Sequence, residues 1–348
     1  MNLAPWQQRI YQQAADAFDQ ERLPHALLFA GPARLGKREV AEKLARRVLC
    51  LGRRAGEEAC GQCRSCQLFD SRTQWTRSND RGELSEMPET RPDGELVHPF
   101  GYSAHPDVQF IGQSWNEKVS PPKMRGEIVI EQIRQMSEKL ALTAQYGAHQ
   151  VALLDPADAI NHAAANALLK TLEEPQPGRF IWLISAHPAR LPATIRSRTQ
   201  KLEFRLPAQA EALQWLIARG HSQSDAENAL AIARGHPGLA DQWLGNGVLA
   251  LRAEVAEALQ NLRRDASAIS PLAQQWVADE NAAQRLSFAA DIALQAARHS
   301  DAERMKKLAH WFDEANQCRN LLRTPIRADL AVLGLLQNWH ALWRSEHL

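Results

Sequence analysis

The stretch Leu27–Val40, LLFAGPARLGKREV, decides how the first part of the chain folds. It has most of the pattern G-x-x-x-x-G-K-[ST], in which a loop after a buried strand binds phosphate through its backbone amides. Gly31, Gly36 and Lys37 occupy their places in this pattern, and the Lys37 ammonium is expected to reach phosphate oxygens. Arg38 stands where a Ser or Thr hydroxyl would hold magnesium, and a guanidinium cannot ligate a cation. The sequence therefore predicts a loop with the shape of an ATP-binding loop but with weak or absent ATP binding.

The length and composition indicate a soluble globular protein of two or three domains. The chain has 348 residues, of which 45% are hydrophobic and 23% charged. A formal net charge of +1 argues against a protein whose main role is to coat nucleic acid. The first residues, MNLAPWQQRIYQQAADAF, lack the apolar core of a signal peptide, and no apolar run approaches the ~18 residues that span a bilayer. We therefore expect a cytoplasmic protein.

Short apolar runs alternate with helical periodicity up to Phe204, without hairpin signals, which is typical of a parallel, doubly wound α/β sheet. The predicted strands are His25–Ala30, Val108–Ile111, Gln150–Leu154, Phe180–Ile184 and Thr199–Phe204. Residues 71–104 carry Pro, Gly and mixed charge without periodicity, and we interpret them as an insertion loop that is partly disordered.

The pattern after Pro207 is helical to the end of the chain. We predict three domains: an α/β domain over residues 1–206, a small helical domain over 207–246 and an all-helical domain over 247–348.

Four cysteines, Cys50, Cys60, Cys63 and Cys66, are predicted to bind one zinc ion in a module over about residues 50–66. Thiolates at this spacing can surround a tetrahedral Zn²⁺. An iron–sulfur cluster would require C-x2-C-x2-C-x3-C-P, which is absent, and four open thiols in a reducing cytoplasm are the remaining alternative. No open ligand position is suggested, so the zinc would be structural. Cys318 stands alone and is interpreted as a buried apolar residue.

Four further motifs lie in a specific order around the loop and the cysteines. They are Leu23–Phe29 (LPHALLF), His105–Asp107 (HPD), Asn166–Pro175 (NALLKTLEEP) and Arg196–Thr199 (RSRT). Together they resemble bacterial clamp-loader subunits of the AAA+ class, specifically the delta-prime subunits of DNA polymerase III. The resemblance covers about residues 1–245, and the C-terminal part only by its length and helical character.

This resemblance implies an AAA+ module followed by a helical lid over residues 207–246 and a helical collar over 247–348. The collar would assemble with the tau/gamma and delta subunits. The complete clamp loader would then open the sliding clamp and place it on primed DNA. The chain itself would belong to a DNA-directed DNA polymerase holoenzyme without having ATPase or polymerase activity of its own.

The site residues depart from the pattern of active relatives. There, the strand resembling Val151–Asp155 ends in Asp-Glu; the Asp helps to hold magnesium and the Glu activates water. Here Asp155 is followed by Pro156, which cannot accept a proton, and Asp158 lies too far along to replace the Glu. Gly238 stands where active relatives have an Arg that touches the nucleotide. The predicted degenerate nucleotide site thus consists of Gly31, Gly36, Lys37 and Asp155.

One catalytic group of the family is kept. In the resembling subunits, the Arg of a Ser-Arg-Cys motif points across the interface into the neighbour's ATP site. Here Ser197, Arg198 and Thr199 keep the arginine, so we expect Arg198 to act as an arginine finger in trans, with no catalytic residue in cis. The alternative is a surface salt bridge, for which Arg190 and Arg196 are the better candidates.

Three alternatives remain from the sequence. A divergent ATPase could use other residues, or Lys37 and the loop amides could bind nucleotide weakly. A motor subunit of the tau/gamma type would require the missing hydroxyl and Asp-Glu pair. A stand-alone DNA-binding or repair ATPase would require a strongly basic face.

The basic residues are scattered along the chain and are expected to be mostly solvated. Any DNA contacts are expected to be shared with partners and to be made through phosphates. The basic residues include Arg46, Arg47, Arg53, Arg54, Arg263 and Arg264.

Overall fold

The computed structural model describes residues 2–73, 77–78, 84–85, 90–91, 96–116, 119, 123–322 and 327–344. The chain separates into two compact units. One contains residues up to Gly220 together with Ala233–Leu239, and the other contains His221–Ile232 and Ala240–Leu348. The disorder predicted within residues 71–104 falls on residues outside this described set.

The first unit is built on a five-stranded sheet in which every neighbouring pair is parallel. Its strands are β1 (Ala26–Ala30), β6 (Val108–Ile111), β9 (Gln150–Leu154), β10 (Arg179–Ser185) and β11 (Gln200–Glu203), in the spatial order β11-β1-β10-β9-β6. The predicted parallel sheet is thus confirmed. All five residues of β1 are buried, which explains its continuous apolar run.

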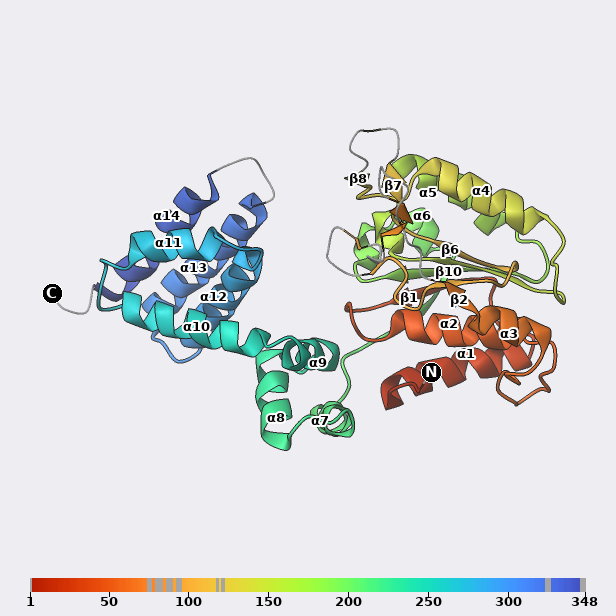
Figure 1. Ribbon diagram of the computed structural model, residues 1–348, viewed down its shortest axis with the longest axis horizontal. Helices are drawn as coiled ribbons and strands as arrows, with labels where there is room; N and C mark the ends of the chain where they lie inside the picture. The colour runs from red at the N-terminus through yellow and green to blue at the C-terminus, as the bar shows by residue number, and fades with distance from the viewer. Residues whose placement is uncertain are drawn as a thin grey trace. The chain divides into compact units, whose positions relative to one another are not determined.

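Helices cover both faces of this sheet (Figure 1). Successive strand side chains point to opposite faces, so Leu27 and Phe29 pack in one core and Leu28 in the other. The first core includes residues of α1 (Pro5–Asp19) and α2 (Lys37–Leu49). The second includes residues of α4 (Ile130–Ala141) and α5 (His162–Glu173). The other short helices of this unit are α3 (Arg64–Asp70), η1 (Ala157–Ala159), η2 (Pro188–Arg190), α6 (Ala193–Arg196) and α7 (Gln209–Ala218). The residues of α9 (Pro237–Gly245) are divided between the two units.

The turn after β1 requires glycine. Gly31 has φ +148°, and a Cβ there would lie 2.1 Å from the carbonyl oxygen of Phe204. The Phe204 amide donates to the carbonyl of Ala30 at 2.7 Å, so the residue that follows β11 lies in direct contact with the start of the loop. This close approach decides where the loop begins.

Short antiparallel pairs lie outside the main sheet. β2 (Arg72–Thr73) pairs with β5 (Tyr102–Ser103), β3 (Arg77–Ser78) with β4 (Leu84–Ser85), and β7 (Trp115–Asn116) with β8 (Lys123–Met124). The described residues between 71 and 104 thus include short strands that the sequence analysis did not predict. Strands of two residues have no detectable periodicity, which is why the sequence does not reveal them.

The second unit is helical where it is described, as expected for the end of the chain. Its helices are α8 (Gln223–Ile232), α10 (Val248–Leu262), α11 (Ile269–Val277), α12 (Ala282–Ala297), α13 (Ala302–Leu321) and α14 (Ala328–Arg344). The indole of Trp339 donates to the carbonyl of Leu259 at 2.8 Å, and its ring centroid lies 4.7 Å from that of Trp311. Cys318 is buried in the same core, as predicted. Among the described helices, none is long and apolar enough to cross a membrane.

Replacing Trp339 by Ala is expected to destabilise this helical unit by about 3–5 kcal/mol, because it removes a fully buried ring and leaves the Leu259 carbonyl without its donor. Urea unfolding followed by circular dichroism measures the loss. Leu330→Ala, at a residue 54% exposed in the same helix, is the matched control and should change the free energy of unfolding by less than about 0.5 kcal/mol. Equal losses in the two variants would contradict this account of the core.

Candidate nucleotide and metal sites

Residues at the start of α1 contact the phosphate-binding loop. Gly36 has φ +81° and immediately precedes α2, and a Cβ there would lie 1.8 Å from Nε2 of Gln7. The side chains of Trp6 and Gln7 both donate to the carbonyl of Leu35, at 3.3 and 3.2 Å. The loop therefore ends in a left-handed turn at Gly36, and contacts from a helix that precedes it in the chain fix its conformation.

Lys37 is engaged by the loop itself. Its ammonium donates to the carbonyl oxygens of Gly31 at 2.8 Å and Pro32 at 2.5 Å. Burial lowers the pKa of Lys37 to about 8, although the carboxylates of Asp155 and Asp158 oppose that shift. The group expected to contact phosphate is thus satisfied by main-chain acceptors in this conformation.

Arg38 lies beside the carboxylate that would hold magnesium in an active relative. Its guanidinium donates to Asp155 at 3.1 Å and to Glu42 at 2.5 Å, and it stacks on the ring of Phe110 at 4.6 Å. The side chain of Arg38 is only 8% exposed, so a full positive charge is buried against two carboxylates. Asp155 therefore already has a cationic partner, and that partner comes from the loop.

Contacts also account for the places of Asp158 and Gly238. Asp158 accepts hydrogen bonds from the hydroxyl of Ser185 at 2.6 Å and the amide of Ala186 at 3.1 Å, so it is bound to the end of β10. At Gly238, a Cβ would lie 2.0 Å from the carbonyl oxygen of Arg34. The ring of His236 forms a 2.8 Å hydrogen bond with the carbonyl of Ala33. This segment packs against the loop too closely to accept an arginine at position 238.

Arg198 lies just after α6 on an exposed part of the surface. It forms an ion pair with Glu173 at 2.7 Å and donates to the carbonyl of Thr194 at 3.0 Å. Its side chain is 37% exposed. The preference for Arg190 or Arg196 as the surface salt bridge was wrong, because among the described residues Arg198 forms this pair. Glu173 belongs to the NALLKTLEEP run, and the fold brings its α5 next to α6.

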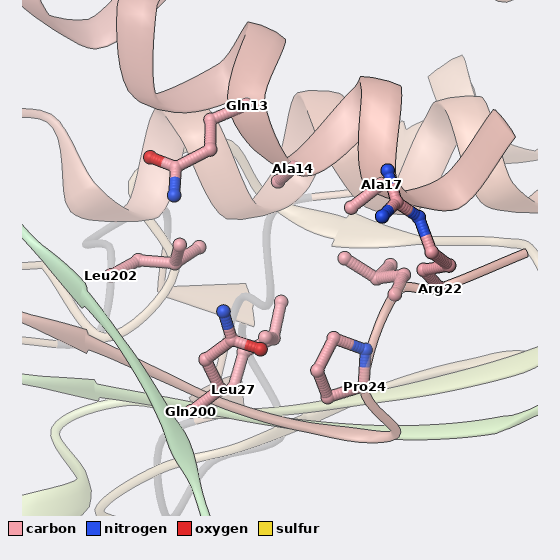
Figure 2. Close-up of a pocket in the computed structure, with 9 residues that line it drawn as sticks. Gln13, Ala14, Ala17, Arg22, Pro24, Leu27, Gln200 and Leu202 are labelled. Carbon is pink, nitrogen blue, oxygen red and sulfur yellow. The ribbon is translucent and has the colours of Figure 1, made fainter. Parts of the chain in front are cut away.

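A small cavity of about 200 Å³ lies between α1 and the edge of the sheet (Figure 2). Gln13, Arg22 and Gln200 supply its polar lining. It adjoins Pro24, which precedes β1, whereas the phosphate-binding loop follows β1. The cavity is therefore at the opposite end of the strand from the candidate nucleotide site.

The four predicted cysteines converge. Their sulfur atoms all lie within 4.8 Å of one another, and those of Cys50 and Cys63 are 3.9 Å apart. The amides of Cys60, Cys63 and Cys66 each donate to the sulfur of the preceding cysteine, at 3.3 to 3.4 Å. Burial acts to raise the pKa of Cys63, but hydrogen bonds from the amides of Cys66 and Leu51 outweigh it and bring the value to about 6. The cluster can hold a metal ion, and its all-sulfur donor set fits zinc.

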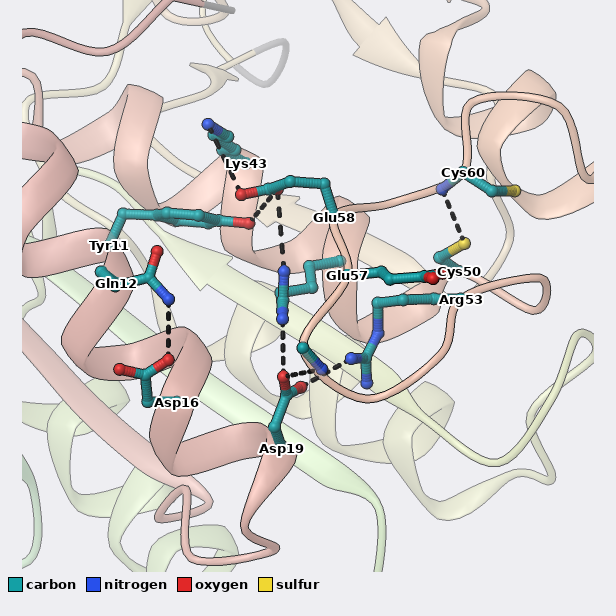
Figure 3. Close-up of polar contacts among 12 residues, drawn as sticks. Tyr11, Gln12, Asp16, Asp19, Lys43, Cys50, Arg53, Glu57, Glu58 and Cys60 are labelled. Carbon is teal, nitrogen blue, oxygen red and sulfur yellow. Dashed lines mark hydrogen bonds and ion pairs between the residues drawn. The ribbon is translucent and has the colours of Figure 1, made fainter.

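A partly buried polar network connects the cysteine module to α1 (Figure 3). Asp19 accepts from Arg47 at 2.7 Å, from Arg53 at 2.6 Å and from the amide of Gly56 at 2.7 Å. The hydroxyl of Tyr11 donates to Glu58 at 2.5 Å.

The expectation that the arginines near the cysteines are solvated was wrong for Arg47, whose side chain is 2% exposed. Its place in α2, three residues after the buried Leu44 and next to the buried Val48, was the available signal.

The HPD motif also has a structural role. His105 forms a 2.8 Å hydrogen bond with the hydroxyl of Ser65, next to Cys66, and accepts from the amide of Asp107. Asp107 in turn accepts from the amides of Gln145 and Tyr146, at 2.8 and 2.7 Å. The motif thereby fixes the cysteine module to the start of β6.

The cluster predicts about one zinc ion per chain, measured by elemental analysis of the purified protein. Cys60→Ser removes one of the four ligands and should leave much less than one zinc per chain. Cys318→Ser is the matched control, since Cys318 lies outside the cluster, and it should keep the wild-type content. Equal zinc content in both variants, or no zinc in the wild type, would contradict the assignment.

Comparison with known proteins agrees with the motifs. Residues 6–76 and 96–208 match the family described as "DNA polymerase III, delta subunit", and the gap falls inside the predicted insertion. The delta-prime subunit of Pseudomonas aeruginosa is 35% identical over 278 residues, which are 79% of this chain and 71% of that protein. That of Haemophilus influenzae is 31% identical over 255 residues, 72% of this chain and 64% of that protein. The tau subunit of Bacillus subtilis is 26% identical over 222 residues, which are 31% of its length. The chain therefore belongs to the family of DNA polymerase III delta-prime subunits.

Proposed function

We propose that this chain is a non-hydrolysing, stator-like subunit of the DNA polymerase III clamp loader. The observation that supports this most directly is the buried ion pair between Arg38 and Asp155, at 3.1 Å. Because a guanidinium neutralises the carboxylate that would bind magnesium, and because Pro156 replaces the general base, two steps of ATP hydrolysis lack their residues. The close packing of Gly238 on the loop removes a third contact.

The proposal extends to the domains and partners. Residues 1–206 would form the AAA+ module, 207–246 its lid and 247–348 a collar that assembles with the tau/gamma and delta subunits. The complex would load the sliding clamp onto primed DNA in the bacterial cytoplasm. The cysteine module would hold a structural zinc ion, and nucleotide would bind weakly or not at all at Gly31, Gly36, Lys37 and Asp155.

Arg198 is proposed to act in trans on a neighbour's ATP site. The side chains of Arg198 and Glu173 are 37% and 49% exposed, and surface ion pairs of this kind contribute about 0–1 kcal/mol to stability. Releasing Arg198 from Glu173 would therefore cost little compared with what a finger contributes to a transition state. The surface position of Arg198, in contrast to the burial of Arg38, suits a group that must reach another chain.

The rival functions have less support. The similarity to a tau subunit makes a motor subunit of the tau/gamma type the first rival. Such a subunit would need a Ser or Thr in place of Arg38 and a Glu in place of Pro156. A stand-alone DNA-binding or repair ATPase would need a strongly basic surface, whereas the formal net charge is +1. Binding of DNA by the isolated chain would favour this second rival.

The purified chain is expected to show no ATP turnover with magnesium present, and weak or no binding in a nucleotide titration. The physical reason is the cation already paired with Asp155 and the absence of a base at position 156. Turnover that Lys37→Ala abolishes would refute the proposal, because the loop would then support catalysis without the missing groups.

Arg198→Ala in the reconstituted clamp loader is expected to lower the rate at the neighbouring ATP site by about 10³–10⁵-fold, the usual contribution of an arginine finger. Single-turnover ATP hydrolysis by the complex measures it, and Arg190→Ala is the matched control at another exposed arginine. Size-exclusion chromatography should show that both variants assemble. An Arg198→Ala complex that hydrolyses ATP at the control rate would exclude the finger.

A further inference from the structure

Arg91, which belongs to the predicted insertion over residues 71–104, lies beside Asp155 of the candidate nucleotide site. Nη1 of Arg91 lies 3.5 Å from Oδ1 of Asp155, while Arg38 binds the other oxygen of the same carboxylate. Asp155 thus lies between two guanidinium groups, one from the loop and one from the insertion. The side chains of Arg91 and Asp155 are 14% and 12% exposed, so water screens their interaction only in part.

A second arginine of the insertion binds the other carboxylate of the cluster. Arg72, at the start of the insertion, lies 3.0 Å from Oε2 of Glu42, whose Oε1 accepts from Arg38. Glu42 is fully buried. Arg72 and Arg91 therefore contact the same two carboxylates as Arg38, and three guanidinium groups share two carboxylates in one cluster. A buried carboxylate is stable only with a cationic partner, so removing one of these arginines weakens the cluster.

Apolar and aromatic contacts hold the described end of the insertion in place. Val97 and His98 are buried, and an isolated bridge between Thr90 and Leu96 brings the Arg91 and Val97 segments together. The ring of His98 stacks on Tyr102 with centroids 3.7 Å apart.

The segment that contains Val97 and His98 also contacts Phe110, the aromatic residue that packs against Arg38. The His98 ring packs against Phe110 at 6.0 Å, and Phe110 carries the guanidinium of Arg38 on its face. Burial lowers the pKa of His98 to about 3, with Arg38 and Arg72 adding to the shift, so the ring is neutral beside these cations.

We propose that the insertion is an intrachain occupant of the nucleotide site: Arg91, together with Arg38, takes the place beside Asp155 that magnesium takes in an active relative. This inference rests on the proposed non-hydrolysing function and extends it by assigning a role to the insertion. It means that restoring the loop hydroxyl alone does not restore binding of a magnesium–nucleotide complex. It also means that the site keeps one conformation whatever the nucleotide concentration.

The test compares Arg38→Thr, Arg91→Ala and the double variant in the full-length chain. The probe is a fluorescent ATP analogue with magnesium, and the readout is its dissociation constant. The double variant is expected to bind about tenfold or more tightly than Arg38→Thr, which corresponds to about 1.4 kcal/mol. Arg38→Thr combined with Arg205→Ala is the matched control, since Arg205 is 80% exposed and pairs with Glu203 on the edge strand. This control should bind like Arg38→Thr.

Two outcomes would overturn the inference: Arg38→Thr binding as tightly as the double variant, or a double variant no tighter than the wild type. Because Pro156 is unchanged in all variants, the assay measures binding without hydrolysis. ATP turnover by the wild-type chain would instead refute the proposed function, so the two failures are distinguishable.

Hydrogen exchange gives an independent measurement in the otherwise wild-type chain. Arg91→Ala should increase amide exchange in residues 96–104 and in the loop over residues 31–38, because the cluster loses one of its cations. Arg205→Ala should leave both segments unchanged. Unchanged exchange in Arg91→Ala would mean that the insertion is not held at the site by Arg91, and would overturn the inference even if a double variant does not fold.

Discussion

The ion pair between Arg38 and Asp155 is the constraint on which the site depends. It joins the first turn of α2 to the end of β9, two elements that an active relative would connect through magnesium and nucleotide. A buried guanidinium has a large desolvation cost and is stable only with matched partners, here Asp155 and Glu42. Asp155 and Glu42 both lie beside Arg38, and two arginines of the insertion, Arg91 and Arg72, pair with these same carboxylates.

The loop is held by contacts from three separate parts of the first unit. The start of α1 binds the carbonyl of Leu35, the chain after β11 presses on Gly31, and the segment containing Gly238 packs on Arg34. The other end of α1 binds the cysteine module through Asp19. One helix therefore contacts both the loop and the module, and its position is fixed at both ends.

Arginines serve opposite purposes in this chain according to their burial. Arg38 and Arg47 are buried in ion pairs, where losing one partner would leave an uncompensated charge and cost about 3–5 kcal/mol. Arg198 is partly exposed, and its surface pair with Glu173 contributes little to stability, as the proposed role in trans requires. The same residue type is thus structural in one place and suited to an interface in another, and the environment decides which.

The sequence by itself determined the parallel sheet, the helical C-terminal part, the loop and the cysteine cluster. Each of these depends on local spacing: apolar runs of strand length, glycines at fixed offsets, and thiols two residues apart. The pairing of Arg198 with Glu173 and the approach of Arg91 to Asp155 were decided only by the tertiary structure. Arg91 and Asp155 are 64 positions apart. No local pattern encodes such a contact, because the partner of a charge is set by how distant elements pack together.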